Sequence, residues 1–226
     1  MNIVNDKITE YLDGLYRPLS SGLEKLRRES EKNNIPIILK DTETMLMAFV
    51  MSLSPVNILE IGTAVGYSAA CFASICPKAS VTTIEARDTS CEKARENLKD
   101  LGLDNRVKVI HGDAEEVLRR MREKAEEHEN RPFDFVFIDA AKSHYREYWD
   151  HIMELITDDA VIVSDNVLLK GITASEEYLT TRRDRTSMMR MREYLDYITG
   201  LADVYTSVLP VGDGIALSVL KGDRKI

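Results

Sequence analysis

The stretch Asn57–Ser68, NILEIGTAVGYS, decides the fold of this chain. It begins with an apolar run, Ile58–Ile61, interrupted by one acid, and continues into a turn bracketed by Gly62 and Gly66. This order predicts a buried strand, a tight turn and a helix start, the unit on which parallel α/β sheets bind nucleotide-like ligands. Without a Cβ atom at Gly62, the chain can reverse and a ligand can approach its backbone. The alternative is an ordinary strand-to-helix turn of a buried sheet.

Predicted helices and strands alternate after this stretch. The helical patterns cover Tyr67–Ser74, Thr89–Leu101, Ala114–Glu129 and Tyr145–Leu155. The apolar strand patterns cover Ser80–Ile84, Val107–Ile110, Phe133–Ile138 and Ala160–Ser164. Short apolar runs separated by helices predict a parallel sheet with helices on both faces. Two further strands, Val204–Pro210 and Ile215–Leu220, are joined by an Asp-Gly turn at Val211–Gly214 and predict an antiparallel hairpin. We therefore expect a Rossmann-like α/β fold with a mixed sheet of about seven strands.

The segment before the deciding stretch predicts a helical extension. Apolar residues recur at helical spacing in Asp6–Leu12 and Leu19–Asn33, and Asp41 or Thr42 is a candidate cap for a helix that runs to Leu53. With 226 residues the chain fits one domain, a helical cap at 1–55 and a core at 56–226. Towards the C-terminus, the polar stretch Val167–Arg185 predicts a long loop, followed by a helix at Met188–Thr199.

Composition excludes several classes of protein. No apolar run approaches the roughly 18 residues of a membrane helix, and the N-terminus lacks the basic-then-apolar order of a secretion signal, so we expect a cytoplasmic protein without membrane contact. Three cysteines without metal-type spacing favour reduced thiols. The net charge of −8 argues against a general nucleic-acid coat, although arginines concentrate after residue 181.

Acidic residues follow nearly every predicted strand, at the edge where α/β sheets bind ligands. They are Glu60, Glu85, Asp113, Asp139 and the pair Asp165–Asn166. One such acid would be a helix cap, but five in succession exceed what capping requires. Glu85 is placed to accept hydrogen bonds from ribose hydroxyls. Because the turn reads Glu-x-Gly-x-x-x-Gly and lacks the pyrophosphate-binding Gly-x-Gly-x-x-Gly, we expect a nucleoside ligand, with Asp113 at its adenine edge.

Asp139, Asp165 and Asn166 form a second predicted cluster. Two carboxylates and an amide oxygen suit Mg²⁺ or Mn²⁺ and disfavour Zn²⁺. Lys142, three residues after Asp139, is the alternative partner, since a salt bridge would also neutralise the acids.

Together these motifs resemble a known family, the class I, divalent-metal-dependent, S-adenosylmethionine O-methyltransferases related to catechol and caffeoyl-CoA methyltransferases. The resemblance runs from about Ile35 to Leu220 through LEIGTAVGYSA, TIEARDTSCEKARENL, FDFVFIDAAKSHY, VIVSDNVLLKG and GDGIALSVL. It implies a donor site, a metal site and a candidate catalytic pair. The implied donor-binding residues are Gly62, Thr63, Gly66, Tyr67, Ser68, Glu85, Asp113, Ala114 and Asp139. The implied metal ligands are Asp139, Asp165 and Asn166, and the implied catalytic residues are Lys142, as base, and Asp139.

Within that family the sequence is most similar to bacterial tRNA 5-hydroxyuridine methyltransferases, through ETML at 43–46 and RRDRTSMMRMREYLDYI at 182–198. This similarity implies that the wobble base of a tRNA anticodon loop is converted to 5-methoxyuridine. Unpaired bases can be splayed into a pocket while arginines hold the phosphates, and the candidates are Arg182, Arg183, Arg185 and Arg190. A solvated basic surface is the alternative for these arginines. The family also implies a homodimer. A small-molecule catechol-type methyltransferase and a non-catalytic nucleoside-binding regulator are the alternative functions.

Overall fold

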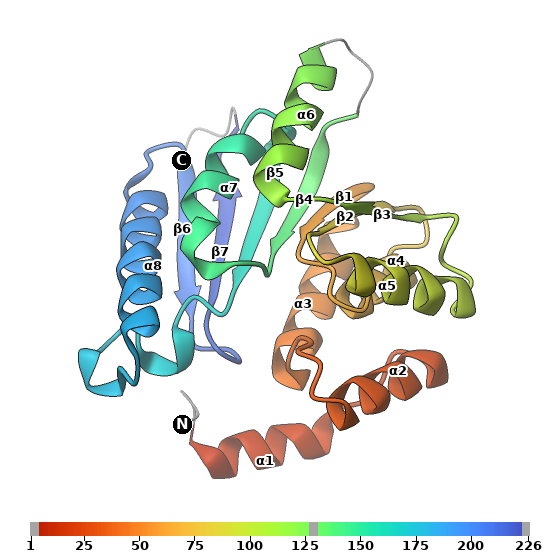
Figure 1. Cartoon of the computed structure of the whole chain (residues 1–226), viewed down its shortest axis with the longest axis horizontal. Helices are drawn as coiled ribbons and strands as arrows, with labels where there is room; N and C mark the ends of the chain where they lie inside the picture. The colour runs from red at the N-terminus through yellow and green to blue at the C-terminus, as the bar shows by residue number, and fades with distance from the viewer. Residues whose placement is uncertain (1–4, 127–130, 223–226) are drawn as a thin grey trace.

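The computed structural model describes residues 5–126 and 131–222 (Figure 1). The α-helices are α1 (Asp6–Leu15), α2 (Ser21–Lys32), α3 (Lys40–Leu53), α4 (Tyr67–Ile75), α5 (Asp88–Asp100), α6 (Ala114–Glu126), α7 (Tyr145–Ile152) and α8 (Arg182–Gly200). The strands are β1 (Asn57–Ile61), β2 (Ser80–Glu85), β3 (Val107–His111), β4 (Phe133–Ile138), β5 (Ile156–Asp165), β6 (Val204–Leu209) and β7 (Ile215–Leu220). Short 3₁₀ helices lie at Lys142–His144, Leu169–Gly171 and Glu176–Tyr178.

The strands form one mixed sheet in the order β3-β2-β1-β4-β5-β7-β6. The strands from β3 to β5 are parallel, and β7 runs antiparallel to both β5 and β6. The predicted Rossmann-like sheet of seven strands with a C-terminal hairpin is therefore confirmed. The strand order reverses between β1 and β4, where connections leave to opposite sides and open a crevice beyond the strand ends.

Helices cover both faces of the sheet and divide the core into two layers. Ile58 of β1 packs with α2, α3 and α4, whereas Leu59 and Ile61 pack with α6, α7 and α8. This division follows from the two-residue period of a strand, which sends successive side chains to opposite faces. Figure 1 shows α8 beside the β6 edge and α1 crossing beneath the rest of the molecule. The hairpin and the helices thus hold the strand ends around one crevice.

The largest difference from the predicted elements lies at α8, which begins at Arg182, six residues before the predicted start at Met188. Thr181 and Asp184 form a capping box there, which satisfies the first amide groups of the helix. The arginines expected in a loop therefore lie on a helix. Helix α3 also differs, because Leu39 is its N-cap and no side chain caps it. The last predicted residues of the Ala114–Glu129 helix lie outside the described residues.

Strand β5 begins at Ile156, four residues before the predicted start, because Ile156 pairs with Phe133 across a register shift in the sheet. Helix α7 accordingly ends at Ile152, before the predicted end at Leu155. Both differences depend on pairing with β4, which local periodicity does not reveal.

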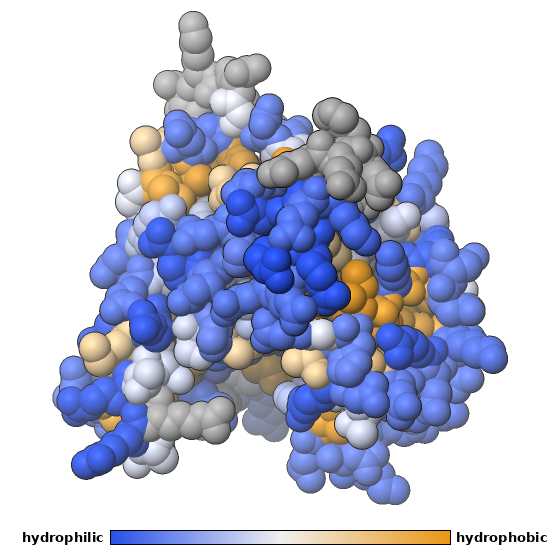
Figure 2. Space-filling model, turned by 45° about the horizontal axis from the view of Figure 1, so that its top comes forward, coloured by the Kyte–Doolittle hydropathy of each residue, from blue (hydrophilic) through white to orange (hydrophobic). Residues whose placement is uncertain are grey.

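Hydrophilic residues dominate the face in Figure 2, and apolar residues form separate patches between them. In the described part of the chain, no helix is both long enough and apolar enough to cross a membrane. Cys71, Cys76 and Cys91 are free and buried. Met188 and Met191 are buried too, so this part of α8 packs in the core.

Candidate active site

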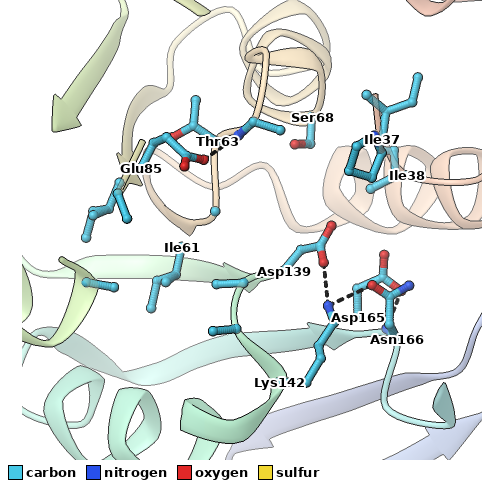
Figure 3. A pocket seen from close by; sticks show the side chains of 18 of the residues that line it. Ile37, Ile38, Ile61, Thr63, Ser68, Glu85, Asp139, Lys142, Asp165 and Asn166 are labelled. Atoms are coloured by element: carbon cyan, nitrogen blue, oxygen red, sulfur yellow. Dashed lines mark hydrogen bonds and ion pairs between the residues drawn. The ribbon is translucent and has the colours of Figure 1, made fainter. Parts of the chain in front are cut away.

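A hollow of about 920 Å³ lies at the carboxyl ends of β1, β2, β4 and β5 (Figure 3). Most residues of the predicted donor site line it, namely Gly62, Thr63, Tyr67, Ser68, Glu85, Asp113, Ala114 and Asp139. The predicted catalytic and metal residues Lys142, Asp165 and Asn166 line it as well. The fold therefore brings both predicted clusters, which lie up to 104 positions apart between Gly62 and Asn166, into one space.

The glycine turn brings the end of β1 against the end of β4. Gly62 has a φ of +102°, and a Cβ added there would lie 2.0 Å from the carbonyl oxygen of Asp139. Only glycine fits such an approach in this conformation. Gly66 also has a positive φ, +82°, but its added Cβ would meet Ala94 of α5, and Gly66 does not line the hollow. Its part in the site is thus to shape the turn at the start of α4.

Glu85 closes β2 on the wall of the hollow opposite Asp139 (Figure 3). Its carboxylate accepts hydrogen bonds from the backbone nitrogen of Ala64 at 2.9 Å and that of Arg87 at 3.0 Å. These bonds fix the carboxylate beside the glycine turn, and each oxygen keeps a further lone pair for a ligand. The role of Glu85 as acceptor of ribose hydroxyls stays a prediction.

A buried acid supports the floor of the turn. Glu60 is fully buried and accepts hydrogen bonds from the hydroxyls of Ser68 and Thr83, and the Thr83 hydroxyl also contacts that of Thr63. Burial raises the pKa of Glu60 to about 8, against the lowering effect of these hydrogen bonds. The hydroxyls of Thr63 and Ser68 thus have partners within the protein. The sequence analysis found Glu60 among the rim acids but missed this supporting role.

Lys142 lies at the centre of the second cluster. Its Nζ donates hydrogen bonds to Asp139 Oδ1 at 2.6 Å, to Asn166 Oδ1 at 2.7 Å and to the Tyr145 hydroxyl at 2.9 Å (Figure 3 draws the first two). The Tyr145 hydroxyl in turn donates to the backbone oxygen of Asp165 at 2.9 Å. The salt bridge considered as an alternative therefore forms, and it ties the ends of β4 and β5 together.

Asp165 is almost fully buried beside this cluster. Burial, followed by repulsion from Asp139, raises its pKa to about 7, although Lys142 opposes the change. Its Oδ1 accepts a hydrogen bond from the backbone nitrogen of Asn166 at 2.6 Å. No described residue donates to its Oδ2. Asn166 has a φ of +58°, a strained conformation that is common at functional sites.

These oxygens fit a hard divalent cation. The side chains that the structure describes include no cluster of three His, Cys, Asp or Glu suited to a metal, and the predicted set has instead two carboxylates and the amide oxygen of Asn166. Mg²⁺ and Mn²⁺ accept this donor set, because they prefer oxygen ligands and keep water or substrate in the remaining positions. The unpartnered oxygen of Asp165 favours added positive charge, whereas a cation bound to Asp139 Oδ1 and Asn166 Oδ1 would compete with the Lys142 ammonium for these two oxygens.

The hollow has further lining residues that the sequence analysis did not assign to the site. The segment Pro36–Leu39 lies across it from the strand ends, and Arg87, His144, Tyr148, Leu169, Lys170 and Asp213 complete the wall. The sequence of Pro36–Leu39 fits no helix, because the segment is short and begins with proline. The other residues come from separate segments, since Tyr148 lies on α7, His144 and Lys170 lie on 3₁₀ helices, and Asp213 lies in the turn between β6 and β7. Only the folded chain brings them together.

Three of the four arginines predicted to bind tRNA lie apart from the hollow. Arg182, Arg185 and Arg190 are exposed on α8 and do not line it, and the Arg183 side chain lies outside the description. Arg185 reaches Glu176 at 3.5 Å, and Arg190 reaches Glu193 at 3.2 Å. Both pairs are exposed and contribute little to stability.

Comparison with known proteins identifies the family. A family model described as O-methyltransferase matches residues 16–221. The chain belongs to the O-methyltransferase family. It is 32% identical over 178 residues to the O-methyltransferase imqG of Aspergillus flavus, a match that covers 78% of this chain and 72% of that protein. It is 31% identical over 168 residues to the catechol O-methyltransferase of Niastella koreensis, covering 73% of each.

Solved structures of this O-methyltransferase family share the fold. A putative caffeoyl-CoA O-methyltransferase from Staphylococcus aureus superposes with a TM-score of 0.85 at 30% identity, covering 93% of this chain and 98% of that one. The O-methyltransferase from Bacillus cereus in complex with SAH has a TM-score of 0.81 at 27% identity, covering 95% and 97%. The match to the family thus extends over the glycine turn, both clusters and the hairpin.

Proposed function

We propose that this O-methyltransferase uses S-adenosylmethionine and a divalent cation, Mg²⁺ or Mn²⁺, to methylate one of two adjacent oxygens on its acceptor. The observation that carries the proposal is the common hollow, in which the turn at Gly62 and the carboxylate of Glu85 face the cluster of Asp139, Lys142 and Asn166. A methyl donor and a chelating acceptor can meet there. The Bacillus cereus relative, solved with SAH, supports the choice of donor.

In this proposal each part of the chain has a defined task. Asp139, Asp165 and Asn166 would hold the cation, which supplies Lewis acidity that lowers the pKa of the acceptor hydroxyl. The turn at Gly62 and the carboxylate of Glu85 orient the donor, so that transfer is favoured by proximity. Lys142 Nζ donates three hydrogen bonds here as an ammonium, so it would have to release one proton to solvent when the cation binds before it could take up the acceptor proton.

For the acceptor, we propose 5-hydroxyuridine at the wobble position of tRNA. Its 5-hydroxyl lies beside the 4-carbonyl and offers the adjacent oxygen pair that the cluster requires. The exposed arginines on α8 support this choice, because α8 follows the loop that leads from Asn166 and is linked to it by a hydrogen bond from Arg192 Nε to the Thr173 carbonyl at 2.8 Å. Phosphates of an anticodon loop would have cationic partners on that side.

A small catechol is the second candidate acceptor, favoured by the similarity to the Niastella koreensis catechol O-methyltransferase. Catechol presents the same adjacent oxygen pair and needs no arginine surface. The two acceptors therefore differ in their dependence on Arg182 and Arg185 and agree in their dependence on Asp165.

The deciding experiment incubates the protein with labelled S-adenosylmethionine, Mg²⁺ and either tRNA that carries 5-hydroxyuridine or free catechol. Digestion of the tRNA to nucleosides should place the label on 5-methoxyuridine. Replacing Arg182 and Arg185 with Gln should weaken tRNA methylation and leave catechol turnover unchanged. Faster turnover of catechol than of tRNA would contradict the tRNA assignment. Donor binding without transfer to either acceptor would indicate a nucleoside-binding regulator.

The metal requirement has its own test. EDTA should abolish transfer and added Mg²⁺ should restore it, and Asp165→Ala should lower the rate by at least about 100-fold, the range reported for lost catalytic electrostatics. Full activity of Asp165→Ala would refute the cation site. The homodimer also remains our prediction, which sedimentation of the purified protein checks.

A further inference from the structure

A second hollow, of about 580 Å³, lies on the face of the sheet that α6 covers. It shares no lining residue with the hollow at Gly62, Glu85 and Asp139, which we call the donor hollow. Asn57 at the start of β1, Thr82 of β2 and Ile110 of β3 contribute to its lining. The donor hollow lies at the carboxyl ends of the strands, whereas Asn57 and Phe133 begin β1 and β4. The second hollow thus runs along the α6 face from the start of β1 to His111 at the end of β3, on lining residues separate from those of the donor hollow.

Four cationic side chains surround this second space, which we call the basic hollow. They are Lys108 of β3, Arg120 and Lys124 of α6, and Arg131 before β4. Among the side chains that the structure describes, no carboxylate lies within ion-pair distance of Lys108, Lys124 or Arg131, whereas Arg120 forms an ion pair with Glu116 at 3.9 Å. Lys108, Lys124 and Arg131 therefore lack, within the described part of the chain, the ion-pair partner that Arg185 and Arg190 have on α8.

The carboxylate that lines the basic hollow, that of Glu154, already has an ion-pair partner. Glu154 forms an ion pair with Arg122, a residue outside the lining. The Thr82 hydroxyl also has no hydrogen-bond partner among the described residues, and it can serve a ligand as donor or acceptor. Beside these polar groups, Ile110 and Met121 supply apolar lining. The basic hollow therefore combines a cationic rim, a free hydroxyl and apolar surface.

Charge explains why this arrangement points to a ligand. The chain carries a net charge of −8, yet four cations converge here, and three of them, Lys108, Lys124 and Arg131, have no ion-pair partner among the described residues. Like charges that lie close together repel one another, and a bound anion would relieve this repulsion. A concave site with one sign of charge focuses its field and concentrates counter-ions. Its volume falls within the range of small-molecule sites, about 300–1,000 Å³, and lysine and arginine are the usual partners of phosphate groups.

We infer that the basic hollow binds a phosphate ester of about nucleotide size, with Lys108 and Lys124 as its principal charged contacts. The ester can belong to a free nucleotide or to an RNA strand, since both present the same phosphate group. The inference does not depend on the acceptor of methyl transfer, because the two hollows are separate.

The test uses the whole protein with S-adenosylhomocysteine at saturation, so that the donor hollow is filled. Calorimetric titration with inorganic pyrophosphate and with cytidine 5′-monophosphate should show saturable binding to one site, weakening as salt rises. The variant Lys108→Gln/Lys124→Gln should bind roughly tenfold more weakly or worse. The matched control Lys93→Gln/Lys99→Gln removes two exposed charges from α5 and should bind like the original protein.

Binding of tRNA to the same variants identifies the source of the phosphate. An equal loss of tRNA affinity in Lys108→Gln/Lys124→Gln assigns the phosphate to RNA, and unchanged tRNA affinity with lost nucleotide affinity assigns it to a free nucleotide. The inference is overturned if no probe binds saturably, or if the control pair loses as much affinity. Because methyl transfer is not the readout, this result is independent of the proposed reaction.

Discussion

Arg27 connects the N-terminal helices to the donor hollow, and its replacement by Met gives the sharpest prediction. Arg27 is 4% exposed, and its Nη2 donates to Glu43 Oε2 at 2.5 Å and to the Ile38 carbonyl at 2.9 Å. Its Nε donates to the Tyr67 hydroxyl at 3.1 Å. Burial, the largest single effect, would lower the pKa of Arg27, but the hydrogen bonds and charge interactions with Glu43 and Tyr67 together outweigh it and raise the pKa. The guanidinium therefore remains charged in the interior.

The expected loss of stability follows from the buried Glu43 carboxylate, which Arg27→Met leaves without a counter-charge. Glu43, 2% exposed, would keep hydrogen bonds from the hydroxyls of Tyr16 and Tyr67 but lose its counter-charge. Removing one partner of a buried ion pair costs about 3–5 kcal/mol. For a chain of 226 residues each kcal/mol lowers Tm by about 2–4 °C, so we expect a fall of about 6–20 °C.

The same variant should weaken donor binding. Arg27 holds the carbonyl of Ile38, and the segment Pro36–Leu39 lines the donor hollow. A lost hydrogen bond to a charged group is worth about 1.5–3 kcal/mol, so KM for S-adenosylmethionine should rise roughly tenfold or more.

Thermal and chemical unfolding, together with donor kinetics, measure these effects. The control is Arg28→Met, because Arg28 is the next residue, is 75% exposed and pairs with Glu24. Such surface pairs contribute about 0–1 kcal/mol. If Arg27→Met and Arg28→Met lose the same stability and leave KM unchanged, the positioning role of Arg27 is refuted. The double variant Arg27→Met/Glu43→Leu should recover stability, since both charges are removed, without restoring KM.

Three further predictions concern the core of the site. Burial raises the pKa of Glu60 from 4.5 to about 8, so its contribution to stability is present below pH 4.5 and is lost as the pH rises towards 8. Glu60→Gln should therefore flatten the fall of Tm between these pH values. The same slope of Tm against pH in the variant and the original protein would contradict the assignment. Gly62→Ala should lower the free energy of unfolding by about 2 kcal/mol or more, because its Cβ would lie 2.0 Å from a backbone oxygen at a φ of +102°. A variant with unchanged stability and with normal donor affinity by calorimetry would refute this prediction. Tyr145→Phe removes the hydroxyl that holds Lys142 and should lower kcat about tenfold without changing donor KM. The control Tyr205→Phe alters an exposed tyrosine of β6 outside the hollow and should leave kcat unchanged, and equal kcat values for the two variants would exclude the tether.

Local sequence determined much of this fold. The pattern of Asn57–Ser68 predicts its strand, turn and helix because strand periodicity and glycine conformations depend on neighbouring residues. The Asp-Gly step predicts the hairpin between β6 and β7 for the same reason. Acids at strand ends were also visible in sequence, since parallel strands place their carboxyl ends along one edge of the sheet. The gathering of Glu85, Asp139 and Asp165 around one hollow could therefore be expected.

Tertiary structure alone decided how these groups are paired. Lys142 lies between Asp139 and Asn166, and Arg27 joins Glu43, Ile38 and Tyr67, because chain segments distant in sequence pack together. Periodicity reports which face a residue occupies and does not report which distant side chain it meets.

The basic hollow was beyond sequence analysis for the same reason. Its cations come from β3, from α6 and from the start of β4, and each alone reads as an ordinary surface charge. The packing of α6 against the sheet brings them around one space. The sequence alone thus determined the sheet and its acidic edge, whereas the tertiary structure decided which charges are neutralised and which remain free for a ligand, because neutralisation depends on distances in space.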